Sequence, residues 1–279
     1  MLTRTGKRPL SFWLLTAFFV LFVLFLYGPM LTIYTLSFQG PTGGLTFPMR
    51  GYSLVWFQGL LEQRRTGDFA GSMTRSLILG VACMFLTVAI SVAAGLAFRT
   101  KFKGSGAVFY LAIASLVMPG LFVSLGLAIT MQLAGLRPQW WYSALGAHLT
   151  WTLPFGLLIM FAILNRFNPA FEEAARDLGA TPWQTFRKVI FPILAPGLIG
   201  IALFGFTLSY DEFPRSILAM GSKNTLPHEI YAMTTTVTSP SLFALGTITT
   251  GISFIIIAAA LGSIALINRR RGQKLTNQS

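Results

Sequence analysis

Long apolar blocks separated by short polar stretches dominate this sequence. Each block has close to the number of residues, about 20, that a helix needs to cross a bilayer core about 30 Å thick. Unpaired backbone groups are too costly in lipid, and barrel strands would read as short alternating segments, so the blocks are predicted to be helices. The pattern predicts an all-α, polytopic membrane protein. Its single transmembrane domain would span residues 1–279, with membrane spans at 12–36, 73–98, 108–133, 144–164, 193–210 and 242–267.

The distribution of basic residues predicts the orientation of these helices in the membrane. Most of the 21 Lys and Arg residues fall on the side of the predicted membrane that holds the N-terminus, with clusters before the first block and after the last. Cytoplasmic loops carry such an excess, so both termini are predicted to lie in the cytoplasm. Because the basic residues sit between apolar blocks, the net charge of +13 indicates topology and contact with anionic lipid. Nucleic-acid binding is not expected.

The composition argues against an enzyme. The sequence holds one cysteine, Cys83, and two histidines, His148 and His228, which is too few for an ordinary metal site. It has no H-E-x-x-H or G-x-S-x-G motif, so we expect neither catalytic nor metal-binding residues. We interpret His148 as a residue at the membrane interface.

The energy for transport is predicted to come from a separate protein. The sequence lacks the G-x-x-x-x-G-K-[ST] loop that binds nucleotide phosphates. The interiors of the second, third, fifth and sixth predicted spans carry no ionisable residue of the kind that relays ions in secondary transporters. An unpowered secondary transporter therefore remains only the less favoured alternative.

The predicted cytoplasmic loop 165–192 has signals for two short helices. Asn168 followed by Pro169 is typical of a helix start, and Gly179 is typical of a stop in the left-handed conformation. Thr181 and Gln184 have the spacing of a capping box that starts a second helix. Pro192 would then mark the entry into the fifth span.

The first of these short helices is amphipathic. Its apolar positions share one face, and its charged positions occupy most of the rest: Phe171, Ala174, Ala175 and Leu178 against Glu172, Glu173, Arg176 and Asp177. Such a helix either docks on a partner protein or lies on the membrane surface. Amphipathicity alone leaves both interpretations open.

The same loop carries a motif. Glu173-Ala174-Ala175, Gly179 after three further residues, and Val189-x-Phe191-Pro192 resemble the EAA loop of the permeases of binding-protein-dependent ABC importers, with Val189 and Phe191 in place of Ile and Leu. The resemblance implies the type I importer transmembrane fold, in the bacterial inner membrane. It also implies an ATPase dimer that holds ATP and Mg²⁺, a second permease subunit and a periplasmic solute-binding protein. The residues placed at the ATPase interface would be Glu172, Glu173, Ala174, Ala175, Asp177 and Gly179.

The outer end of the fifth span concentrates acidic residues. Tyr210, Asp211 and Glu212 could attract a cationic substrate, with a cation–π contact to the tyrosine. They could equally anchor a polar helix end at the interface. Segments here and further on resemble spermidine/putrescine permeases, namely Ser209–Glu212, Thr225-Leu226-Pro227 and Ser239-Pro240. Ser241 departs from their usual acidic residue. A polyamine is thus the favoured substrate, with an amino acid derivative, an opine or a phosphonate as alternatives.

Overall fold

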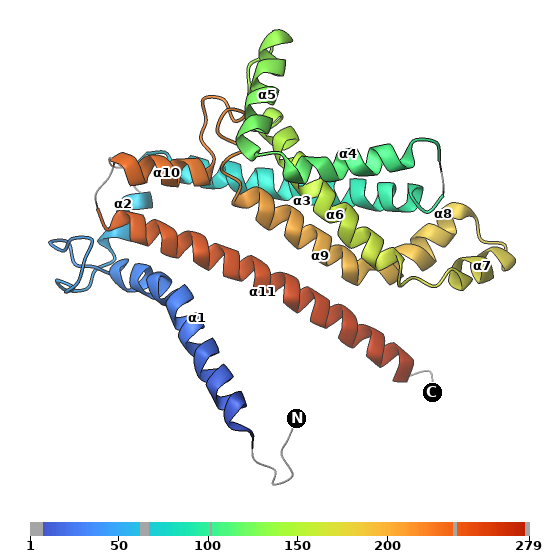
Figure 1. The fold of residues 1–279 in the computed structure, drawn as a ribbon, viewed down its shortest axis with the longest axis horizontal. Coiled ribbons are helices and arrows are strands. Elements are labelled where there is room, and N and C mark those ends of the chain that lie inside the picture. The colour runs from blue at the N-terminus through green and yellow to red at the C-terminus, as the bar shows by residue number, and fades with distance from the viewer. Residues whose placement is uncertain (1–7, 62–66, 101, 237–238, 277–279) are drawn as a thin grey trace. The chain divides into compact units, whose positions relative to one another are not determined.

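The computed structural model describes residues 8–61, 67–100, 102–236 and 239–276. Over these residues the secondary structure is helical, and a single isolated β-bridge joins Gln39 to Tyr52. The prediction of an all-α fold is confirmed (Figure 1).

The helices divide between two compact units. Unit 1 comprises residues 1–66 and 233–252, and unit 2 comprises residues 67–232 and 253–279. The helices are α1 (Leu10–Leu36), α2 (Val55–Leu61), α3 (Phe69–Ala97), α4 (Ser105–Val117), α5 (Gly120–Leu133), α6 (Ser143–Leu164), α7 (Ala170–Asp177), α8 (Pro182–Thr185), a π-helix (Phe186–Ile190), α9 (Phe191–Tyr210), α10 (Leu226–Thr236) and α11 (Ser241–Thr276). Helices α10 and α11 contribute residues to both units.

Unit 1 pairs an apolar helix with a compact turn. In α1, Leu36 is buried and the long apolar side chains before it are mostly exposed, as expected for a helix that meets lipid or another chain. After α1, the buried side chain of Gln39 holds the loop together. It donates to the carbonyl oxygens of Gly44 and Thr46 and accepts from the backbone N–H of Arg50. The indole N–H of Trp56 donates to the backbone carbonyl of Gln39. One glutamine thus organises the start of the long first outer loop.

Unit 2 is built on α3, α6 and α9, which pack against one another (Figure 1). Toward the predicted cytoplasmic end, an apolar cluster joins them: Val92, Met160, Phe167, Ile190, Leu194, Leu198 and Ile201. A second cluster, toward the other end, joins α3 and α6 to the loop after α9: Leu79, Ala144, Ala147, Ala219 and Met220.

Small and hydroxylated residues let these helices approach closely. A Cβ added at Gly156 would lie 2.3 Å from Ser91 Oγ and 2.8 Å from Thr87 Cγ2. The hydroxyls of Thr87 and Thr152 are 2.8 Å apart and hydrogen-bonded across α3 and α6. In an apolar solvent, close packing and interhelical hydrogen bonds drive helix association, so this contact is central to unit 2.

The third predicted span is wrong as a single helix. We expected one helix over 108–133, but α4 and α5 meet at a bend of 111°. Pro119 has no N–H to continue the helix and disfavours helical geometry at the residue before it. Met118 is accordingly extended, with φ −69° and ψ 125°. Figure 1 shows α5 leaving the direction that α4 follows beside α6.

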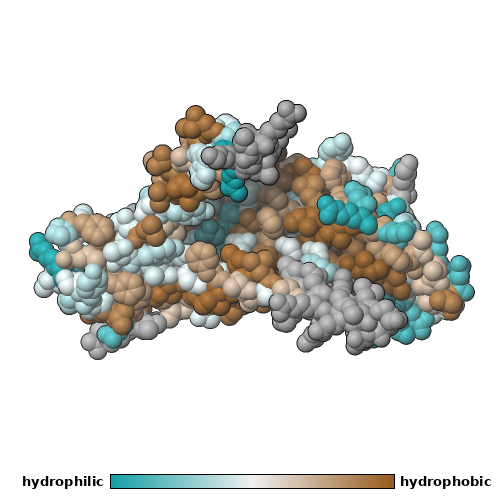
Figure 2. Space-filling model, turned by 90° about the horizontal axis from the view of Figure 1, so that it is seen from below, coloured by the Kyte–Doolittle hydropathy of each residue, from teal (hydrophilic) through white to brown (hydrophobic). Residues whose placement is uncertain are grey.

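The surface agrees with a membrane location. Within the described part of the chain, five helices are long and apolar enough to cross a bilayer, and the bent pair of α4 and α5 brings the number to six if it counts as one span. On the face shown in Figure 2, apolar residues cover wide areas and hydrophilic residues gather in small groups. Such a surface would be poorly soluble in water.

The close contact at Gly156 gives a testable prediction. Gly156→Ala should lower the unfolding free energy by about 1–3 kcal/mol, because Ser91 and the stiff Thr87 must move to admit a methyl group. The matched control is Gly200→Ala in α9, where an added Cβ meets nothing within 4 Å. Denaturant titration of both variants in detergent checks this, and equal midpoints would contradict it.

Candidate functional site

The loop between α6 and α9 folds as predicted in its main features. The Asn168 side chain accepts from the N–H of Ala170 at 3.1 Å, but the N-cap of α7 is Pro169 rather than Asn168, so the helix begins one residue later than expected. At the other end, Gly179 has φ +78°, and the N–H of Ala180 bonds back to the carbonyl of Ala175 at 3.0 Å. This is the left-handed helix stop that glycine favours.

The second short helix is not separate from the span that follows. Thr181 and Gln184 do form a capping box, with hydrogen bonds of 3.3 and 2.9 Å. However, α8 continues through the π-helix into α9, so a single helical rod of 29 residues runs from Pro182 to Tyr210. Pro192 lies two residues after the π-helix and does not interrupt the rod. Arg187 and Lys188 lie in the π-helix.

A buried ion pair attaches α7 to the end of α3. Glu172 is 8% exposed, and its Oε1 lies 2.5 Å from Nη1 of Arg99, the second residue after α3. Arg99 also lies over the ring of Phe167, 5.6 Å from its centre. Arg176, on the solvent side, reaches Glu172 only at 3.7 Å. The position of α7 therefore depends on Arg99.

The ion pair fixes which face of α7 points outward. Glu172 and Ala175 are buried, so the structure does not place these two predicted interface residues on the free surface. Besides Arg176, the exposed residues of this stretch are Phe171, Glu173, Ala174, Asp177, Leu178 and Gly179, and Trp183 of α8 is exposed as well. Leu178 is 89% exposed and Trp183 65%. We call this apolar and acidic set the inner docking face.

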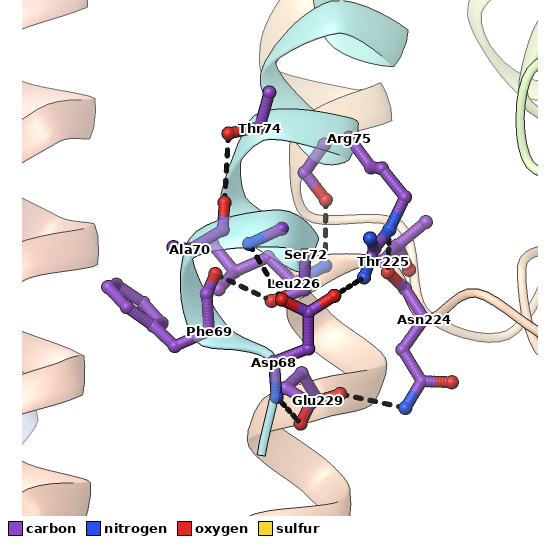
Figure 3. Close-up of polar contacts among 12 residues, drawn as sticks. Asp68, Phe69, Ala70, Ser72, Thr74, Arg75, Asn224, Thr225, Leu226 and Glu229 are labelled. Atoms are coloured by element: carbon purple, nitrogen blue, oxygen red, sulfur yellow. Dashed lines mark hydrogen bonds and ion pairs between the residues drawn. The ribbon is translucent and has the colours of Figure 1, made fainter. Parts of the chain in front are cut away.

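The opposite end of unit 2 holds a second polar network (Figure 3). Asp68 caps α3 through the N–H of Gly71 and binds Arg75 at 2.9 Å. Arg75 donates to the carbonyl of Asn224 at 2.7 Å, while Glu229 accepts from the N–H of Asp68 at 3.0 Å and from the Asn224 side chain at 2.7 Å. The network surrounds a recess of about 220 Å³ and joins residues about 150 positions apart. It fixes the outer end of α3 against the start of α10.

Tyr210, Asp211 and Glu212 do not form one site. Tyr210 is buried, stacks on Phe206 with ring centres 5.6 Å apart, and donates its hydroxyl to the sulfur of Met73. Its ring is thus not free for a cation. Glu212 is buried and paired with Arg215, at 3.5 Å. Asp211 alone is exposed, and partial burial raises the pKa of its carboxyl above the usual value.

Two residues that sequence reasoning placed elsewhere belong to this end of the bundle. His148, interpreted as an interface residue, is fully buried; its Nδ1 and Nε2 each lie 2.8 Å from a hydroxyl, of Ser209 and Ser216. Arg215, in the predicted outer loop between the fifth and sixth spans, is 4% exposed and lies over Trp151, 4.3 Å from its ring centre. No motif pointed to either residue, since His148 contacts Ser209 and Ser216, and Arg215 lies over Trp151, in each case far away in the sequence.

Comparison with known proteins gives the same assignment as the loop. The family model described as "Binding-protein-dependent transport system inner membrane component" matches residues 86–273. The spermidine/putrescine transport system permease protein PotC of Escherichia coli K12 is 28% identical over 238 residues, which cover 85% of this chain and 88% of PotC. The putrescine transport system permease protein PotI of the same strain is 30% identical over 237 residues, covering 81% and 82%.

Solved structures show the same fold. A chain of a bacterial ABC transporter that imports the acidic polysaccharide alginate superposes with a TM-score of 0.65 at 17% identity, over 92% of this chain and 96% of that one. A chain of the MetNI methionine ABC transporter, in an inward-facing conformation, gives a TM-score of 0.57 at 18% identity, over 71% and 95%. The predicted importer transmembrane fold is confirmed.

The Arg99–Glu172 pair can be tested by its effect on α7. Arg99→Ala leaves the buried Glu172 carboxylate without its close partner and should speed amide exchange over residues 172–178 by about tenfold to a hundredfold. Arg176→Ala is the control, because that contact is long and solvent-exposed and should change exchange by less than about threefold. Hydrogen–deuterium exchange in detergent measures both. Similar protection in the two variants would mean that Arg99 does not hold α7.

Proposed function

Because the chain belongs to the family of inner membrane components of binding-protein-dependent transport systems, we propose that it forms, with a second permease, the translocation path for a polyamine or a related organic cation. It is a multi-pass inner membrane protein and a permease subunit of an ABC importer. The energy for uptake comes from a separate ATPase that carries ATP and Mg²⁺. The periplasmic binding protein delivers the substrate.

The observation that carries the coupling role is the inner docking face. An exposed Leu178 and Trp183 beside Glu173 and Asp177 would be unfavourable on a surface that stayed in water. A central apolar anchor with charged neighbours suits a groove on a partner protein. Burial of Glu172 on the opposite side of α7 supports docking over a helix that only lies on the membrane, because it ties α7 to the bundle.

The substrate assignment rests on two supports. Both relatives named above are polyamine permeases, and Asp211 offers an exposed carboxylate at the predicted outer end of α9. The fold alone does not identify the substrate, since the solved structures with the same fold belong to an alginate importer and a methionine transporter. A permease for an amino acid derivative, an opine or a phosphonate is the second candidate. The pairing of Glu212 with Arg215 favours it to the extent that it removes one carboxylate from cation attraction.

The assembly follows from the same premise. We infer one copy of this chain with a different second permease, two ATPase subunits and one binding protein. Affinity purification of the tagged chain from its native membrane in mild detergent, followed by mass spectrometry, tests this. Recovery of an ATPase and another multi-span permease supports the proposal. Recovery of the folded chain alone would favour an unpowered transporter.

Leu178 provides a direct test of coupling. Leu178→Asp should weaken ATPase association by about tenfold or more and abolish ATP-driven uptake, because the apolar side chain that docking would bury is replaced by a charge. Leu136→Asp, also at an exposed leucine but in the loop after α5, is the matched control and should assemble normally. Co-purification yield and uptake in proteoliposomes are the measurements. Normal ATP-driven uptake by Leu178→Asp would rule out the inner docking face.

Asp211 predicts a pH dependence. Burial raises the pKa of its carboxyl, so the charge is present above that raised pKa and is lost as the pH falls through it. The KM for putrescine uptake should therefore rise as the outside pH is lowered, beginning above the pH at which an ordinary aspartate protonates. Asp211→Asn should show the high KM at every pH, and Asp211→Glu should restore a pH-dependent step. A wild-type KM that does not change with pH would exclude Asp211 from cation attraction.

A further inference from the structure

Arg215 carries a permanent charge into the protein interior. The guanidinium does not lose its proton in proteins, and only 4% of the residue is exposed. It must therefore be stabilised by groups that the protein supplies in place of water. Those groups come from three parts of unit 2.

The three groups form a cradle of mixed chemistry. Glu212 contributes a carboxylate, whose Oε1 lies 3.5 Å from Nη1 of Arg215 and accepts its backbone N–H at 3.0 Å. Met118, at the break between α4 and α5, contributes a carbonyl 3.4 Å from Nη2. Trp151 of α6 contributes the face of its ring, 4.3 Å from the guanidinium carbon. We call these three groups the cation cradle.

The cradle holds the guanidinium loosely. Both hydrogen bonds from its terminal nitrogens are longer than the usual 2.7–3.2 Å. Its third nitrogen, Nε, is buried and has no acceptor among the described residues. A guanidinium presents five donors in a fixed plane, which this arrangement does not match. A carboxylate, a carbonyl and an aromatic face are instead the groups that recognise an alkylammonium ion.

The cradle also lies next to the exposed carboxylate. Glu212 adjoins Asp211 in the chain, and Met118 is half exposed. The backbone that carries Arg215 is held by other bonds. Ser216 bonds to His148, the N–H of Leu218 donates to Ser124, and Ser143 donates to the carbonyl of Ala219. The side chain of Arg215 can thus leave the cradle without unfolding the loop.

We propose that Trp151, Glu212 and the Met118 carbonyl form a binding site for an organic ammonium group, and that Arg215 occupies it as a tethered cation which the substrate displaces. The inference rests on the proposed cationic substrate. The Arg215 guanidinium already lies against the Trp151 ring and the Met118 carbonyl, so a second cation can contact these groups only after the arginine side chain leaves, and occupancy is exclusive. Arg215 then sets a threshold: a weakly bound monovalent cation fails to displace it, and a dication attracted also by Asp211 succeeds.

The test empties the cradle and offers it a small cation. The purified complex without its binding protein carries Arg215→Ala, and the probe is ethylammonium, whose binding is measured by calorimetry. The variant should bind the probe at least about tenfold more tightly than the wild type, and putrescine should compete with it. Arg215→Lys keeps a tethered cation and should bind as weakly as the wild type. Adding Glu212→Gln to Arg215→Ala should abolish the gain.

The outcomes separate the site from the transport function. Probe binding that putrescine does not displace would show a purely structural cradle and overturn the proposal, as would no gain in probe binding. If Arg215→Ala does not assemble, Arg215→Met keeps the apolar stem without the charge and receives the same titration with ethylammonium. Putrescine uptake by the wild-type complex is measured separately. Displacement without uptake would overturn the proposed polyamine transport and leave the cation site standing.

Discussion

A polar group inside this helix bundle must find its partner within the protein, and the rest of unit 2 follows from that constraint. Apolar contacts between helices differ little from contacts with lipid and leave the alignment of the helices loosely determined. The hydroxyl pair of Thr87 and Thr152 aligns α3 with α6. His148 aligns α6 with α9, through Ser209, and with the loop beyond it. Each bond has one good geometry, so a few polar residues determine how three apolar helices meet.

Both ends of α3 are fastened by the same means. At its start, Asp68 and Arg75 join the network that includes Glu229; just after its end, Arg99 holds Glu172 of α7. One helix therefore connects the inner docking face to the outer network. A displacement of α7 is passed to α3 through the short, largely buried ion pair between Glu172 and Arg99. Such a packed contact transmits displacement better than a solvated loop would.

The membrane spans and the helix cap could be predicted from the sequence, because the bilayer and the local backbone geometry determine them. Apolar blocks revealed the spans because lipid imposes their length and composition, and the capping box of Thr181 and Gln184 needs only near neighbours. The break at Pro119 had a local signal, but proline occurs in continuous spans as well, and only the packing of α4 and α5 distinguishes the cases. The inward position of Glu172 depends on Arg99, 73 residues earlier. Arg215 was missed because charges in outer loops are usually solvated.

The helical rod from Pro182 to Tyr210 joins the two functional regions without a flexible link. Its 29 residues extend about 43 Å, from Trp183 in the inner docking face to the residues just before Asp211 and Glu212. The π-helix near its start is the one stretch of the described rod where the backbone takes the wider i→i+5 hydrogen-bond pattern, and such segments often mark functional positions in helices. Movement of the docking face must therefore either be absorbed there or be carried to the outer end. Since α9 is packed against α3 and α6, carrying it outward would shift Glu212 against Trp151, and so link the cation cradle to the state of the ATPase.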